Sequence, residues 1–135
     1  MRGILADTNI GGHFQILLRL FQEKSRKELW ESLKLSTPTF HDLGLPDRAL
    51  DSVVWNRCQQ DDLVLITANR NASGPDSLES AIRTSNSPGS LPVFTIADPD
   101  SVMESREYAE RVADRLLEYL FDIERCRGVE RLYLP

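Results

Sequence analysis

Short apolar runs alternate with helical stripes along this chain, and that alternation restricts the fold more than any other feature. Residues 63–67 form an uninterrupted Leu/Val/Ile run, typical of a parallel strand covered on both faces. Residues 3–6, 35–40 and 92–96 have strand length as well, and the strongest helical stripe covers residues 109–123. The resulting order β-α-β-α-β-α-β-α predicts a single-domain α/β/α sandwich with a four-stranded parallel sheet.

The strand order expected for this sheet is 2-1-3-4, with strands numbered along the chain. Pro38 lies within 35–40 and indicates an edge position for that second strand. The domain is expected to cover residues 1–126. The remaining tail, 127–135, is basic and then apolar, so it can dock on the domain or on a partner subunit.

Helical stretches separate the expected strands. Apolar spacing predicts one long helix or a kinked pair over 14–33, a helix over 47–60 and a short helix over 76–83. Ser101 and Glu104 have the spacing of a capping box, which would begin the last helix.

Composition restricts the classes of partner. The 135 residues suit one domain, and the net charge of -5 counts against a broad nucleic-acid footprint, although a local basic rim around Arg70 remains compatible with it. The N-terminal apolar run ends at Asp7, too early for a signal peptide, and no stretch is long enough to span a membrane. Cys58 and Cys126 lie among apolar neighbours, as core thiols of a reducing compartment do. A cytoplasmic protein is therefore expected.

Polar residues follow two of the expected strands at the point where each strand ends. Asp7 follows the first strand, and Asn69 and Asn71 follow the third. Ligands bind outside the carboxyl ends of the strands in open α/β sheets, so these side chains are expected at one crevice. Asp51, on the next helix, is the second acid expected there. Carboxylate and amide oxygens are ligands that Mg²⁺ and Mn²⁺ prefer.

The triplet Asp7-Thr8-Asn9, the acid Asp51 and the segment 65–71 together resemble small PIN-like domain proteins over residues 3–100. This resemblance implies a metal-dependent endoribonuclease with acids clustered at the strand ends. Many such proteins are the toxin of a toxin–antitoxin pair, so the resemblance also implies RNA and an antitoxin as partners. The chain departs from the family where two Asp residues usually follow the third strand, because Asn69 and Asn71 stand there and weaken metal binding.

The first hypothesis is therefore RNA hydrolysis at a Mg²⁺ or Mn²⁺ ion. Asp7 and Asp51 would hold the metal, and Asp76, with Glu79 beyond it, could restore the missing acids. The proposed catalytic residues are Asp7, Asp51, Asn69, Asn71 and Asp76, and the proposed substrate-binding residues are Asn9 and Arg70.

Two other hypotheses use the same residues differently. The chain can be a PIN-like module that binds or assembles without cleaving, as a homo-oligomer formed through the apolar end of the tail. It can also be an aspartyl-phosphate phosphatase or a receiver-like domain that uses Asp7. Against this, Asn9 stands where haloacid-dehalogenase-like phosphatases have an acid, and no lysine follows a central strand.

Each candidate residue also has a purely structural interpretation. Asp7 and Asn9 can cap the next helix, and Asn69 and Asn71 can be turn residues. Acids such as Asp51 and Asp76 are also favoured in the first turn of a helix, where they interact with its dipole.

Overall fold

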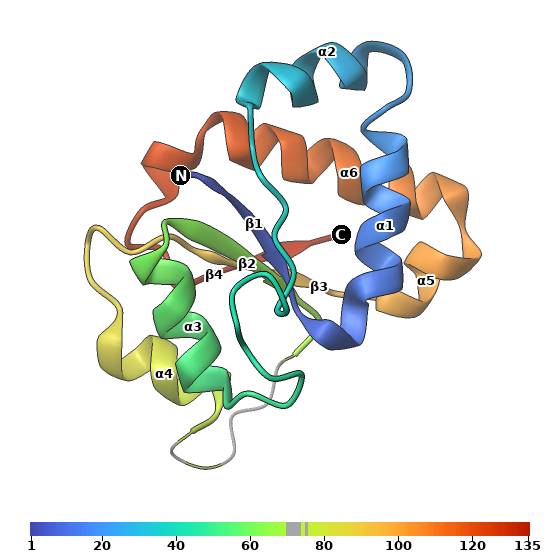
Figure 1. The fold of residues 1–135 in the computed structure, drawn as a ribbon. Coiled ribbons are helices and arrows are strands. Elements are labelled where there is room, and N and C mark those ends of the chain that lie inside the picture. Colours follow the sequence, from blue (N-terminus) through green and yellow to red (C-terminus); the bar gives the residue numbers. More distant parts are fainter. Residues whose placement is uncertain (70–73, 75) are drawn as a thin grey trace.

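The protein is built on one parallel sheet of four strands, seen in a computed structural model that describes residues 1–69, 74 and 76–135. The strands are β1 (Gly3–Ala6), β2 (Leu63–Thr67), β3 (Val93–Ile96) and β4 (Arg131–Leu134), and they lie side by side in that order (Figure 1). All three pairings are parallel, so all four strands end at the same edge of the sheet.

Helices cover both faces of the sheet. One face carries α1 (Gly11–Leu20), α5 (Pro99–Glu104) and α6 (Arg106–Phe121), and the other carries α3 (Asp51–Gln60) and α4 (Leu78–Ser85) (Figure 1). This arrangement confirms the predicted α/β class with a four-stranded parallel sheet.

Three further elements complete the described structure. The helix α2 (Lys24–Leu33) follows α1 and contacts α6, so the predicted stretch 14–33 is a pair of helices. The 3₁₀ turns η1 (Thr8–Ile10) and η2 (Ile123–Cys126) follow β1 and α6. None of the helices in the described part of the chain is long and apolar enough to cross a membrane.

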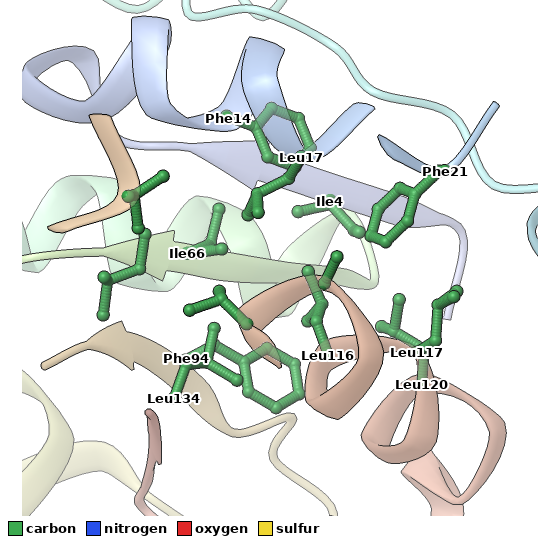
Figure 2. Packing of buried hydrophobic residues seen from close by; sticks show 14 of the residues in the cluster. Ile4, Phe14, Leu17, Phe21, Ile66, Phe94, Leu116, Leu117, Leu120 and Leu134 are labelled. Carbon is green, nitrogen blue, oxygen red and sulfur yellow. The ribbon is translucent and has the colours of Figure 1, made fainter. Parts of the chain in front are cut away.

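Strand residues divide between two hydrophobic clusters because neighbouring side chains point to opposite faces. Ile4, Ile66 and Phe94 face α1 and α6, and all three are fully buried. Figure 2 shows them meeting Leu17 and Leu116 from those helices. The other cluster contains Leu5, Leu63, Leu65 and Val93, packed against side chains of α3 and α4. The strands β1, β2 and β3 are therefore covered on both sides, as the continuous apolar sequence of β2 predicts.

The predicted strand order 2-1-3-4 is wrong. Residues 35–40 form no strand, and a single bridge joins Ser36 to Gly3 at the outer side of β1. Pro38 has no N–H to continue a ladder. Thr39 and Asp42 bind each other instead, because each donates a backbone N–H to the other's side chain at 2.8 and 3.1 Å. The fourth strand is β4, from the tail, which docks on β3 of the same chain.

Helix boundaries differ from the predictions by a few residues. The helix predicted from residue 47 begins at Asp51, and that predicted over 76–83 covers Leu78–Ser85 behind the N-cap Ser77. The predicted capping box is wrong, because Ser101 lies inside α5. Asp98 caps α5 by accepting from the Ser101 N–H at 3.3 Å, and Ser105 caps α6.

Gly3 makes the close approach of β1 to Ser36 possible. A Cβ at Gly3 would lie 2.2 Å from the Ser36 carbonyl oxygen, which accepts the Ile4 N–H at 2.9 Å. We expect Gly3→Ala to lower the free energy of unfolding by about 1–3 kcal/mol, because bonded backbone must move to admit the methyl group. Gly12→Ala is the matched control, since a Cβ there meets nothing within 4 Å. Equal denaturation midpoints for the two variants would contradict this expectation.

Candidate functional site

Asp7 lies where β1 ends, and β2 fixes its side chain. The Asp7 backbone N–H donates to the Ile66 carbonyl at 2.9 Å, which extends the β1–β2 ladder by one residue. Oδ1 of Asp7 accepts the Thr8 backbone N–H at 2.8 Å, and Oδ2 accepts the hydroxyl of Thr67 at 2.8 Å. Thr67 is the last residue of β2 and is fully buried. The carboxylate is thus oriented by two donors from adjacent strand ends.

Asn69 connects this end of β2 to the start of α3. Its backbone N–H donates to Thr67 Oγ1 at 2.9 Å, and its side-chain Nδ2 donates to Asp51 Oδ2 at 2.9 Å. Asp51 is the first residue of α3, and the preceding residue, Leu50, has an extended backbone conformation. A continuous hydrogen-bonded chain therefore runs through Asp7, Thr67, Asn69 and Asp51, and these four residues are called the strand-end network below.

The electrostatics of Asp7 favour the loss of its negative charge. Burial raises the pKa of this carboxyl group, the hydrogen bonds from Thr67 and Thr8 lower it, and the charge of Asp51 raises it again, with a raised pKa as the net result. A proton or a bound cation would remove the unfavourable charge. A proton or a cation at the Asp7 carboxylate is therefore favoured in this environment.

This raised pKa predicts a pH-dependent effect of Asp7→Asn on stability. The folded protein binds a proton at Asp7 more tightly than the unfolded chain does, so the wild type loses stability as pH rises through the raised pKa. Asn caps a turn about as well as Asp does. We expect Asp7→Asn to have a higher Tm than the wild type at pH 7, with the difference vanishing below the ordinary pKa of aspartate.

Melting curves from pH 3 to pH 8 in a metal-free buffer measure this difference. Asp100→Asn is the control, because Asp100 is an exposed acid in the first turn of α5, at the same edge of the sheet. A neutral-pH Tm that falls in Asp7→Asn would contradict the expectation and assign Asp7 a mainly structural role.

Arg131 is a residue of this region that the sequence analysis did not identify. It begins β4, and only 7% of its side chain is exposed. Nη1 donates to the Asn69 carbonyl oxygen at 2.9 Å and to the Thr95 hydroxyl, and Nε donates to Glu79 Oε1 at 2.7 Å. The tail therefore holds the end of β2 through one buried cation. An arginine that opens an apolar run of strand length could have indicated such a buried, paired charge.

Three of the remaining predicted site residues, Glu79, Asp76 and Asn9, do not join the network. Glu79 is engaged by Arg131, and Asp76 accepts a hydrogen bond from Ser52 Oγ at 3.4 Å and is otherwise exposed. Asn9 is exposed in η1. Arg70 and Asn71 lie outside the described residues. Within the parts of the chain that are described, no group of three or more His, Cys, Asp or Glu residues could hold a metal ion.

The two cysteines are free. Burial, with the charges of Asp61 and Asp7, raises the pKa of the Cys58 thiol to about 12. This thiol stays protonated at neutral pH and does not serve as a nucleophile, since the thiolate is the reactive form.

The network offers a restricted set of donors to a ligand. Asp7 and Asp51 supply two carboxylates, and the Asn69 amide lies between them along the hydrogen-bonded chain. Hard oxygen donors of this kind suit a divalent cation, although two carboxylates give a weaker site than three. Comparison of this chain with protein-family models, with curated proteins and with solved structures gave no significant match.

Proposed function

We propose that this chain is a PIN-like endoribonuclease that hydrolyses RNA phosphodiester bonds with the help of Mg²⁺ or Mn²⁺. The observation that carries the proposal is the strand-end network, which couples Asp7 to Asp51 through Thr67 and Asn69. The raised pKa of Asp7 supports it, because a carboxylate that is costly to ionise gains most from a neighbouring cation. The free thiols fit work in a reducing cytoplasm.

The residues of the network would divide the work as follows. Asp7 and Asp51 would hold the cation. When bound, it would polarise the phosphate of the substrate and lower the pKa of a water molecule. Thr67 and the Thr8 N–H keep the Asp7 carboxylate in one orientation, and Asn69 does the same for Asp51. Arg131 is a positioning residue, because it holds the backbone of Asn69 from the side of β4.

The side-chain contacts of Asn69 and Glu79 favour a second candidate function, a PIN-like module that binds or assembles without cleavage. Asn69 donates an N–H to Asp51 in the network, and Glu79 is paired with Arg131. Among the described residues, the network therefore joins two acids, Asp7 and Asp51, and Glu79 adds no third carboxylate to it. A module of this kind would keep the fold and the binding surface but have little affinity for divalent cations.

A Mn²⁺ titration by calorimetry tests the metal site directly. We expect the wild type to bind Mn²⁺ with a Kd of about 1 mM or tighter, and Asp51→Asn to bind at least about tenfold more weakly. Asp100→Asn, which removes the same charge outside the network, should bind like the wild type. If the wild type binds no Mn²⁺ and cleaves no single-stranded RNA, the nuclease proposal is wrong and the module is favoured.

A further inference from the structure

A pocket of about 240 Å³ opens beside Asp7, on the side of β1 away from β2. It lies between the first turns of α1 and the connection from α2 to α3, which passes alongside β1 in Figure 1. Asp7 and Thr8 form the part of its wall nearest to the strand-end network. A group bound in this pocket would therefore sit next to whatever binds at Asp7.

The inner walls of the pocket are apolar and fixed by the core. Phe14 and Leu18 line it from α1, and Pro38 and Phe40 line it from the connection. Phe14 and Phe40 are only 5% and 4% exposed, and they belong to the two hydrophobic clusters on opposite faces of the sheet. Rings held by two separate clusters leave these walls little freedom to collapse, so the pocket is largely preformed.

The outer part of the pocket is polar. Gln15, His41 and Asp47 line it and are exposed. The Thr8 hydroxyl donates to the Asp47 backbone carbonyl at 3.3 Å, which ties the connection to η1. An amide side chain offers both a donor and an acceptor, and an imidazole offers a flat face for stacking.

We propose that this pocket binds a nucleobase of single-stranded RNA, adjacent to the phosphate that reacts at Asp7, an inference that rests on the proposed function. Proteins that read single-stranded RNA stack splayed bases on aromatic side chains, His included, and bond their polar edges. The apolar walls suit the faces of a base, and Gln15 suits its edge. The carboxylates of Asp7 and Asp47 disfavour a phosphate inside the pocket itself.

Nucleosides without phosphate test this pocket separately from metal binding and cleavage. The four ribonucleosides would be titrated into the ¹⁵N-labelled full chain in metal-free buffer, with amide shifts followed by NMR. We expect at least one nucleoside to shift the amides of Gly11, Phe14 and His41, and its monophosphate to bind no more tightly. Gln15→Ala and His41→Ala should each weaken binding by at least about fivefold.

Gln22→Ala and Asp100→Asn are the controls. Gln22 is an exposed glutamine just beyond α1, and Asp100 is an exposed acid in the first turn of α5. Neither lines the pocket, so both variants should bind nucleosides like the wild type. If no nucleoside shifts these amides, or if the affinity survives both Gln15→Ala and His41→Ala, the pocket is not a base site. That failure would leave the Mn²⁺ titration to decide the nuclease proposal. Nucleoside binding without Mn²⁺ binding would keep the pocket and remove the nuclease.

Discussion

Replacing Asp7 by Asn is expected to reduce Mn²⁺-dependent cleavage of single-stranded RNA about 100-fold or more. The substitution removes one of the two carboxylates of the strand-end network while retaining an oxygen for the Thr8 N–H. Loss of a charged ligand weakens the cation and the stabilisation it gives to charge developing at phosphorus. The rate is measured with end-labelled RNA under single-turnover conditions at saturating Mn²⁺.

Two comparisons keep this result interpretable. Asp100→Asn should cleave at the wild-type rate, because it changes the net charge equally without touching the network. The wild-type rate should fall as pH drops through the raised pKa of Asp7, since the protonated carboxyl group no longer attracts a cation. Asp7→Asn is expected to be folded at neutral pH, so a loss of cleavage would not reflect unfolding. Unchanged, Mn²⁺-dependent cleavage in this variant would contradict the proposed function.

Replacing Arg131 by Met is expected to lower the free energy of unfolding by about 2–4 kcal/mol. Removing one member of a buried ion pair costs about 3–5 kcal/mol, and the loss is somewhat smaller here because the Glu79 side chain is 29% exposed. The substitution leaves the Glu79 carboxylate without its Arg131 bond, and the fully buried Thr95 hydroxyl and the Asn69 carbonyl each lose a donor. The methylene chain is roughly preserved, so the change reports on polar contacts more than on packing. Urea denaturation measures the loss.

Arg125→Met is the matched control for that measurement. The Arg125 side chain is 85% exposed and faces Asp122 at 3.5 Å, so its replacement should change stability by less than about 0.5 kcal/mol. Glu79→Gln provides a double-mutant cycle, in which Arg131→Met should cost less than it does in the wild type. A loss in Arg131→Met no larger than in Arg125→Met would show that β4 docks without this pair.

The success and failure of the sequence predictions have a common physical cause. Leu63–Thr67 could be identified as a covered parallel strand because a strand buried on both faces needs apolar side chains at nearly every position, and this pattern is visible within five consecutive residues. The segment 35–40 looked similar but lies beside β1 through Ser36 alone, and local hydrogen bonds at Thr39 replace the ladder. A segment at the edge of a sheet pairs on one side only, so fewer backbone hydrogen bonds are lost when local contacts replace the strand.

The candidate site shows the same division. The polar ends of β1 and β2 placed Asp7 and Asn69 at one edge from sequence spacing alone, because parallel strands end together. Sequence spacing could not show that Glu79 pairs with Arg131 or that the tail forms β4. Arg131 is far from both Asn69 and Glu79 in the chain, and it meets them only because β4 pairs with β3.

The sequence by itself determined the layered α/β architecture and the strand ends that carry Asp7 and Asn69, since periodicity and strand polarity are local properties. Only the tertiary structure decided which segment completes the sheet, which acids share the network and which acid Arg131 engages. It also formed the pocket beside Asp7 from α1 and the connection between α2 and α3. These outcomes depend on contacts between residues distant in sequence, whose energies come from burial and pairing in the folded chain.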